Sequence, residues 1–459
     1  MQFIRMWYKA AMDVQNIHLH NLPMKGHASV QLLSRALVEI RLSGASRMAG
    51  FSRNTYLLCG GLLVTLALYL HTPFPNEAAE PWKQRVTSAS VRIVNDLSVL
   101  GQLLGIASSV NISRFLTENI KHLNIASLQS EILQNVQITE DTFDGVPVRV
   151  YKPAGVQKLL PGIVHIHGGG WALLSVDAYH AFTVELALKA EAIVVSVEYR
   201  LSPEHLFPIP LDDCVTATKY IIQNAEKLGV DSSRVAVMGD SAGGNLAMAV
   251  SLRMKSETQI PKLKVQALLY PALQAMDFNT PSYQQYSQKL RKCPSFATKE
   301  ILVRYWQLYA FGHDGYTSDF YVNNHTTMAL KRSKYAEYVN QKHLPPKYLF
   351  DKDTKAAAKL LENGNIAKKI ESIITNPYFA PLMASDDDLR ELPKTYIMTA
   401  EYDCLRDDGW ILADRLKTLQ HSYEHAHYDG YEHGFALMLH YDVHGKFMDN
   451  VVQYFRKNL

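Results

Sequence analysis

Hydrophobic residues from about residue 145 onwards fall into short runs that alternate with helix-like stretches. Several runs consist almost wholly of valine, isoleucine and leucine, which is typical of strands covered on both faces. The predicted strands are residues 148–151, 162–167, 192–199, 234–238, 265–270, 395–399 and 422–428. The predicted helices between them are residues 178–190, 212–228, 245–255 and 409–419. This alternation predicts an α/β fold with a mostly parallel sheet and right-handed crossovers.

The regular spacing breaks once, where about 120 residues separate the strands at 265–270 and 395–399. A structureless loop of that length is improbable inside a compact domain, so we predict a helical cap inserted at about 284–390. Residues 77–140 show apolar positions every three or four residues, which predicts a helical stem that completes the cap. Residues 141–459 then form the α/β domain that carries the cap.

An uncharged segment lies near the N-terminus, between Arg53 and Glu77, and residues 56–70 are almost entirely apolar. As a helix rising about 1.5 Å per residue, residues 54–76 reach roughly 30 Å, enough to cross a bilayer core. No small-x-small cleavage site follows, so we predict an uncleaved transmembrane anchor at 54–76 rather than a signal peptide. The positive charge before it predicts a cytosolic N-terminus and a lumenal C-terminal part.

Charge is nearly balanced along the chain, with 47 lysines and arginines against 44 acids and a formal net charge of +3. Nucleic-acid binding is therefore not expected. The excess is concentrated in residues 1–53, a basic segment predicted to be cytosolic. Residues 1–47 are either transit-peptide-like or lie ahead of an alternative start at Met48. Two sequons, at Asn111 and Asn324, are candidate glycosylation sites on a lumenal domain.

Cysteine usage argues against a metal cluster or a disulfide scaffold, because the four cysteines contain no CxxC pair. One bridge, from Cys214 to either Cys404 or Cys293, stays open at this point. Neither a metal ion nor an organic cofactor is expected.

Gly239-Asp240-Ser241-Ala242-Gly243 is a G-x-S-x-G motif that follows a predicted strand and opens a predicted helix. In that context the flanking glycines permit a sharp turn that exposes the Ser241 hydroxyl as a nucleophile. The pentapeptide alone is also compatible with an ordinary turn. The surrounding strand and helix favour the nucleophile.

A second glycine-rich segment, His167-Gly168-Gly169-Gly170-Trp171, follows the strand predicted at 162–167. Its flexible backbone can aim N–H groups at the oxyanion of a tetrahedral intermediate, and we assign this role to Gly168 and Gly169 together with Ala242. A phosphate-binding loop is disfavoured because neither GxGxxG nor GxxxxGK[ST] is present.

A serine nucleophile needs a base and an acid that orients the base, in the chain order serine, acid, histidine. Asp403 lies beyond the C-terminal end of the strand predicted at 395–399, whereas Asp407 and Asp408 belong in the first turn of the next helix. His433 lies between glycines after the last predicted strand, and His421, His425 and His427 lie on or beside that strand as packing residues. A histidine metal site is the alternative, but no acid–histidine spacing supports it.

Taken together, these motifs resemble the hormone-sensitive-lipase branch of the α/β-hydrolases, and within it the arylacetamide deacetylase and neutral cholesterol ester hydrolase family. The resemblance covers about residues 48–459 and rests on the segments HGGGW (167–171), VEYRLSP (197–203), GDSAGGN (239–245), LYPALQ (269–274), DFNTPSY (277–283), VNNHT (322–326) and DCLRDD (403–408).

This resemblance implies an α/β-hydrolase fold and a single-pass type II protein of the endoplasmic reticulum that hydrolyses lipophilic esters. Two alternatives remain: an arylamide or xenobiotic deacetylase, and a binding protein on a hydrolase scaffold that has lost its chemistry. The binding protein is disfavoured because His433, which a known receptor of this branch lacks, is present. The oligomeric state is left open.

Overall fold

The computed structural model describes residues 61, 75, 77–125, 130–289, 297–349 and 362–459. The chain divides into two compact units, Met1–Tyr69 and Leu70–Leu459, and the description below concerns the second. Among the described residues, no helix has both the length and the apolar character needed to span a bilayer. The predicted anchor at 54–76 lies outside the described residues apart from two isolated positions, and the basic segment 1–53 lies wholly outside them.

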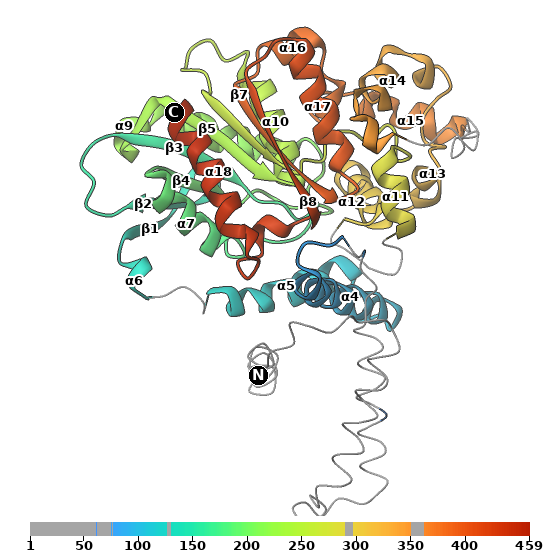
Figure 1. The fold of residues 1–459 in the computed structure, drawn as a ribbon, viewed down its shortest axis with the longest axis horizontal. Helices are drawn as coiled ribbons and strands as arrows, with labels where there is room; N and C mark the ends of the chain where they lie inside the picture. Colours follow the sequence, from blue (N-terminus) through green and yellow to red (C-terminus); the bar gives the residue numbers. More distant parts are fainter. Residues whose placement is uncertain (1–60, 62–74, 76, 126–129, 290–296, 350–361) are drawn as a thin grey trace, which may run out of the picture. The chain divides into compact units, whose positions relative to one another are not determined.

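One eight-stranded sheet forms the centre of the second unit (Figure 1). The strands lie in the order β1-β2-β4-β3-β5-β6-β7-β8. β1 and β2 pair antiparallel to their neighbours, and all other pairs are parallel, as the sequence predicts. Their bounds are β1 Val136–Phe143, β2 Val146–Pro153, β3 Leu160–Ile166, β4 Ile193–Val197, β5 Val230–Asp240, β6 Val265–Leu269, β7 Lys394–Tyr402 and β8 Tyr423–Glu432.

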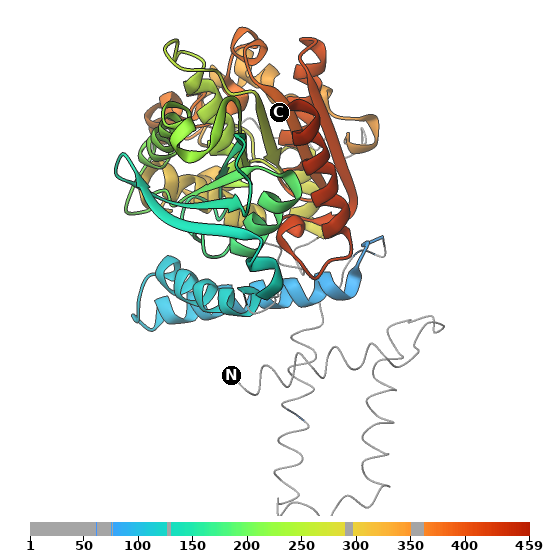
Figure 2. The same cartoon turned by 90° about the vertical axis from the view of Figure 1, so that its left-hand side faces the viewer.

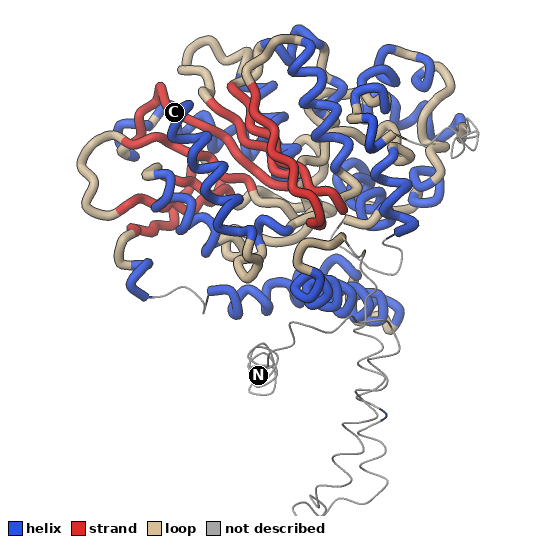
Figure 3. The backbone as a smooth tube through the Cα atoms, viewed as in Figure 1, coloured by secondary structure: helices blue, strands red, loops and turns tan. Residues whose placement is uncertain are grey.

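Helices cover both faces of the sheet (Figure 3). On one face α7 and α18 pack on each other, and Phe182 and Phe447 belong to the buried cluster there. On the other face α8, α9, α10 and α17 pack against the strands. The bounds are α7 His180–Ala190, α8 Ile209–Gln223, α9 Ala225–Leu228, α10 Ala242–Met254, α17 Arg406–Thr418 and α18 Val443–Asn458.

Both central strands β4 and β6 are buried at every position, which explains their continuous aliphatic sequences. The seven predicted strands and four predicted helical regions are all present. β1 was not predicted, and it begins at Val136, inside the segment assigned to the helical stem. This edge strand is largely exposed and polar, so it lacks the aliphatic run that identifies the others.

The long interval between β6 and β7 is largely helical, as predicted, and lies beside the sheet (Figure 1). Tyr309 of α12 stacks on Trp171 and Trp306 packs against it at a tilt, which fixes this insertion to the loop after β3. The bounds are α11 Pro281–Lys289, α12 Lys299–Phe311, α13 Thr317–Tyr321, α14 Lys334–Tyr338, α15 Gly364–Ile374 and α16 Asp386–Arg390.

Within the described residues, three helices precede the sheet: α4 Pro81–Leu103, α5 Ser109–Ile125 and the short α6 Ser130–Leu133. Figure 2 shows α4 and α5 side by side at one end of the hydrolase body. Cys214 and Cys404 are both buried free thiols, so the open possibility of a bridge between these two is excluded. Cys293 lies outside the described residues.

Candidate active site

Ser241 occupies a strained turn between β5 and α10. Its φ of 54° and ψ of −119° fall in a region that side-chain-bearing residues rarely adopt. The Ser241 backbone N–H donates to the Leu269 carbonyl at 2.9 Å, which holds the turn against the end of β6. The hydroxyl is thereby presented at the carboxyl edge of the sheet, where ligands of such sheets bind.

Two glycines make this turn possible. A Cβ on Gly239 would lie 2.3 Å from the Gly243 carbonyl oxygen, and a Cβ on Gly243 would lie 2.1 Å from the carbonyl oxygen of Ile166. Real Cβ atoms do not approach backbone oxygens so closely. The glycines of the motif are therefore required by close backbone packing between β3, β5 and α10.

Asp403 and His433 follow the parallel neighbours β7 and β8, so both lie at the same sheet edge as Ser241. His433 Nε2 is 2.9 Å from Ser241 Oγ, and His433 Nδ1 is 2.7 Å from Asp403 Oδ2. Asp403 is fully buried, and its Oδ1 accepts the Leu405 N–H at 2.7 Å. The structure thus brings the three predicted residues into one continuous hydrogen-bonded chain.

The neighbouring carboxylates make other contacts. Asp407 forms a buried ion pair with Arg406, and Asp408 accepts the Leu273 N–H at 2.8 Å. Burial raises the pKa of the Asp408 carboxyl well above its usual value. Both acids belong to the first turn of α17, as predicted, and hold the loop that follows β6.

The other three histidines near β8 do not join this chain. Thr399 Oγ1 lies 2.8 Å from both His425 Nε2 and His427 Nδ1, and burial lowers the pKa of His425 to about 3 and of His427 to about 4. His421 contacts the Pro393 carbonyl. These are packing contacts, in agreement with the sequence interpretation. Within the described ranges, no three His, Cys, Asp or Glu side chains form a group able to hold a metal ion.

The glycine-rich loop after β3 corrects one sequence assignment. The Gly168 N–H donates to Asp240 Oδ1 and to the Tyr179 hydroxyl, each at 2.9 Å. It is therefore already occupied and is not available to a substrate oxyanion. Sequence alone did not reveal this, because Asp240 approaches Gly168 from the serine motif 72 positions away.

Other N–H groups of the two motifs remain unoccupied. In the part of the chain that the structure describes, the backbone N–H groups of Gly169, Gly170 and Ala242 donate to no protein acceptor. Gly169 has a φ of +105° and Gly170 a φ of +63°, and a Cβ on Gly170 would overlap the Tyr305 ring at 2.7 Å. Only glycine fits both positions, and the Gly170 N–H is unoccupied where the Gly168 N–H is not.

Asp240, Tyr179 and His167 are site residues whose contacts the sequence did not reveal. Burial raises the pKa of the Asp240 carboxyl to about 6, and its Oδ2 accepts the Tyr179 hydroxyl at 3.0 Å. This carboxyl joins the glycine-rich loop to the serine turn. The His167 ring stacks on Tyr199, and burial lowers its pKa to about 4, so it is a neutral packing group.

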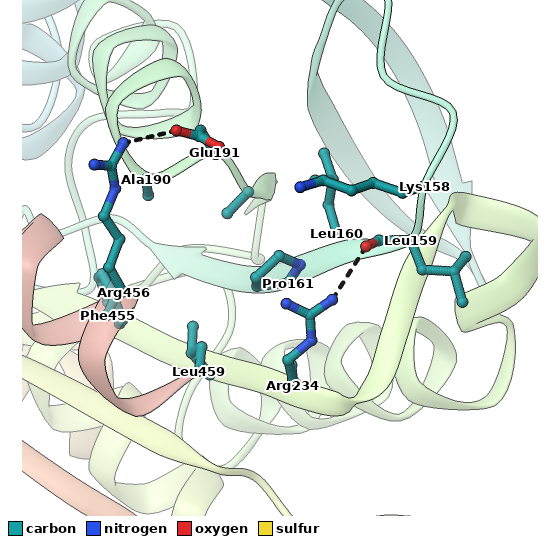
Figure 4. Close-up of a pocket in the computed structure, with 11 residues that line it drawn as sticks. Lys158, Leu159, Leu160, Pro161, Ala190, Glu191, Arg234, Phe455, Arg456 and Leu459 are labelled. Atoms are coloured by element: carbon teal, nitrogen blue, oxygen red, sulfur yellow. Dashed lines mark hydrogen bonds and ion pairs between the residues drawn. The ribbon is translucent and has the colours of Figure 1, made fainter.

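A pocket of about 290 Å³ lies at the opposite end of the sheet (Figure 4). It is lined by Leu160 at the start of β3, by Arg234, and by Arg456 near the C-terminus. Arg456 pairs with Glu191 at 3.0 Å, and Arg234 donates to the Leu159 carbonyl at 3.1 Å. Arg234 and Arg456 therefore already have partners, and the pocket forms no part of the Ser241 site.

Fold and site together define the class of the protein. A family model described as the alpha/beta hydrolase fold matches residues 163–336 and 347–437, which include both glycine motifs, Asp403 and His433. Two solved esterases share the fold. A carboxylesterase called EstE1, cloned from a metagenomic library, has a TM-score of 0.57 at 26% identity over 77% of this chain and 99% of its own. An esterase of Pyrobaculum calidifontis has a TM-score of 0.56 at 26% identity over 79% and 97%.

More similar relatives are found among curated proteins. Neutral cholesterol ester hydrolase 1 of Bos taurus is 37% identical over 374 residues, covering 80% of this chain and 89% of that protein. Arylacetamide deacetylase of Mus musculus is 36% identical over 378 residues, covering 81% and 91%. The resemblance inferred from the motifs is confirmed. The chain belongs to this family of α/β-hydrolases, and it is a carboxylic ester hydrolase.

Proposed function

We propose that the protein hydrolyses esters of lipophilic acids or alcohols through Ser241, His433 and Asp403. The observation that carries this proposal is the hydrogen-bonded chain from Ser241 Oγ through His433 to buried Asp403. The His433 ring accepts the Ser241 proton at Nε2 as Oγ attacks the ester carbonyl, and donates that proton to the leaving alcohol. Water then attacks the acyl-enzyme carbonyl as His433 takes its proton. The bond between Ser241 Oγ and the acyl carbon breaks, the acid leaves, and His433 returns the proton to Oγ, while Asp403 offsets the imidazolium charge.

The tetrahedral intermediate carries its negative charge on the former carbonyl oxygen. The unoccupied N–H groups of Gly169, Gly170 and Ala242 stabilise this oxyanion. Each such donor typically contributes about 10²–10³ in rate. Because Gly168 is bonded to Asp240, its own N–H serves to fix the loop that presents the other two glycines.

A lipophilic substrate is supported by the relative named neutral cholesterol ester hydrolase 1. The second candidate, an arylacetamide or xenobiotic deacetylase, is favoured by the relative of that name at nearly equal identity. Turnover of a long-chain sterol ester and of an acetanilide, measured on the same preparation, separates the two. Faster acetanilide turnover would replace the first candidate by the second.

The proposal extends to residues 54–76 as a type II anchor in the endoplasmic reticulum membrane, with the hydrolase in the lumen. The uncharged stretch from Asn54 to Asn76, preceded by basic residues, supports it. We expect the microsomal protein to stay in the membrane during extraction with alkaline carbonate. We also expect the hydrolase to survive protease added outside the vesicles. Release by carbonate would contradict the anchor, and digestion outside sealed vesicles would contradict the orientation.

The deciding experiment on the chemistry compares wild type and Ser241→Ala in microsomes. A fluorophosphonate probe should label wild type alone, and p-nitrophenyl butyrate hydrolysis should vanish with the label. Ser251→Ala is the matched control, because this buried hydroxyl lies within α10, the helix that follows Ser241, and donates to the Ala247 carbonyl. Unlabelled wild type of correct fold would favour the non-catalytic binding protein instead.

A further inference from the structure

The α4–α5 hairpin exposes an unusual amount of apolar surface. Of the fourteen exposed large hydrophobic side chains among the described residues, ten belong to this hairpin. They are Trp82, Val86, Ile93, Leu97, Val99, Leu100, Leu103, Leu104, Ile106 and Phe115. Leu103 is 79% exposed and Ile106 is 72% exposed. Water-soluble surfaces rarely gather apolar side chains in this way, and such patches mark interaction sites.

The polarity of α4 is inverted relative to an ordinary surface helix. Its buried residues are small or polar, while leucine, isoleucine and valine point outwards. The buried set is Gln84, Thr87, Ser88, Ala89, Ser98 and Gly101. A surface helix in water buries its apolar stripe instead. Helices that face lipid pack through small and polar residues and turn aliphatic side chains outwards, as α4 does.

The exposed face is also uncharged at the tip of the hairpin. Residues 97–113 contain no Asp, Glu, Lys or Arg. An apolar hollow of about 300 Å³ opens there between the two helices, bordered by Leu97, Ile112 and Phe115 among others. The absence of charge favours an electrically neutral apolar partner over an acidic or basic one.

Both helices are tightly fixed to loops that carry the active site. The Glu80 carboxylate accepts the Tyr431 hydroxyl at 2.9 Å and the Asp442 N–H at 3.0 Å, on either side of His433. Buried Gln84 donates to the Gly430 carbonyl at 2.7 Å. The hairpin therefore meets the hydrolase through polar contacts at the His433 loop.

On α5, Arg114 makes the equivalent attachment to the loops that follow β3 and β4. Its guanidinium donates to the Ala172 carbonyl at 2.7 Å and the Ser202 carbonyl at 2.6 Å, and pairs with both carboxylate oxygens of Glu204 at 2.8 Å. Ala172 directly follows the HGGGW segment. The apolar face is thus attached beside the loops of the active site, and its side chains are exposed on the hairpin that Figure 2 shows at one end of the hydrolase body.

We propose that the apolar face of α4 and α5 docks onto a lipid leaflet, inserting into its interfacial region. The proximity of a membrane rests on the proposed anchor, since the five residue steps from residue 76 to Pro81 reach at most about 18 Å even when fully extended. An interfacial helix of this kind buries its apolar side roughly 5–10 Å into the headgroup and acyl boundary. A bilayer-dissolved ester then reaches the Ser241 site from the leaflet on which the hairpin lies.

Fluorescence quenching by brominated phosphatidylcholine tests the docking directly. The full chain is reconstituted into phosphatidylcholine vesicles as Leu103→Trp and as Leu159→Trp, the latter an exposed leucine at the far end of the sheet (44% exposed). The emission added at position 103 should be quenched at least about twofold by bromines near the interface, and the emission added at 159 should not change. Equal quenching at both positions, or none at 103, overturns the proposal. If the emission of the tryptophan at position 103 is blue-shifted but not quenched, the apolar face is covered by protein rather than lipid.

Two further measurements separate this surface from the anchor and from the chemistry. Leu103→Asp combined with Ile106→Asp should lower the ratio of bilayer-ester to soluble-ester hydrolysis about tenfold, against no change for Leu159→Asp. If carbonate releases the protein from membranes but bromines still quench the tryptophan at position 103, the proposed anchor is wrong and the proposed docking surface stands. Asn111 borders the apolar hollow, so an N-glycan found on it would place this face in water and overturn the proposal.

Discussion

Replacing Asp403 by asparagine inverts the roles of the two His433 nitrogens. Asp403 Oδ1 accepts the Leu405 N–H at 2.7 Å, so the amide oxygen of asparagine must take that position to keep the buried N–H bonded. The amide NH₂ group then faces His433 Nδ1, which in wild type lies 2.7 Å from Oδ2. His433 then has to accept a hydrogen bond at Nδ1 and carry its proton on Nε2. That proton faces the Ser241 hydroxyl, so Nε2 cannot accept the hydroxyl proton.

The size of the effect follows from losing the base. A histidine held in the wrong tautomer in a serine hydrolase lowers kcat about 10⁴-fold, which corresponds to about 5.5 kcal/mol of transition-state stabilisation. Asp403 is fully buried and lies behind the imidazole, so KM for p-nitrophenyl butyrate should change little. The assay is kcat per mole of folded enzyme, with the melting temperature measured on the same samples.

Asp408→Asn is the matched control, since it is another fully buried acid five positions along the chain. Burial raises the pKa of Asp408 well above its usual value, which favours its neutral form, and asparagine reproduces that form and still accepts the Leu273 N–H. Its kcat should stay within about threefold of wild type. More than about one hundredth of wild-type kcat in Asp403→Asn, or an equal loss in Asp408→Asn, would refute the assigned roles.

Three more changes test individual contacts. Gly243→Ala places a Cβ 2.1 Å from the Ile166 carbonyl oxygen, so the melting temperature should fall by roughly 5 °C or more, and an unchanged value would contradict the packing argument. Burial raises the pKa of the Glu432 carboxyl from 4.5 to about 7. The part of the free energy of unfolding that depends on the neutral carboxyl is therefore fully present below about pH 4.5, and it is lost as the pH rises through 7. The difference in unfolding free energy between Glu432→Gln and wild type should therefore shift in favour of the variant by the order of 3 kcal/mol between pH 4 and pH 8. A difference in melting temperature that does not change with pH would count against this reasoning. Glu80→Ala removes the acceptor of three donors, so amides of residues 430–443 should exchange with solvent faster and kcat should fall, with unaltered exchange as the contrary result.

Much of the fold was predictable because its strands are buried on both faces. Continuous aliphatic sequences such as those of β4 and β6 have no other common explanation when short helices alternate with them. β1 escaped prediction because it lies at the sheet edge with polar residues at most positions. β1 is stabilised by its pairing with β2, and the sequence of β1 alone does not reveal that contact.

The residues of the site were predictable from their order and from the strands that precede them. Ser241, Asp403 and His433 each follow a strand, so parallel pairing alone carries them to one edge. The occupation of the Gly168 N–H was not predictable, because its partner Asp240 lies 72 positions away in the sequence. The apolar positions of α4 predicted a helix correctly, but Leu97, Leu100 and Leu104 are exposed, since periodicity does not say which side of a helix meets protein.

The contacts between α4 and the loop after β8 have a consequence for synthesis of the chain. Gln84 and Gly430 are 346 positions apart, and Glu80 and Tyr431 are 351 apart. During translation α4 emerges long before its partner exists, so its polar and apolar faces are both uncovered until nearly the whole protein has been made. His433 is made in the same last portion. A polypeptide that terminates early therefore lacks both His433, the proposed base, and the loop that α4 contacts. The cell's quality control then meets an uncovered helix rather than a folded but inactive protein.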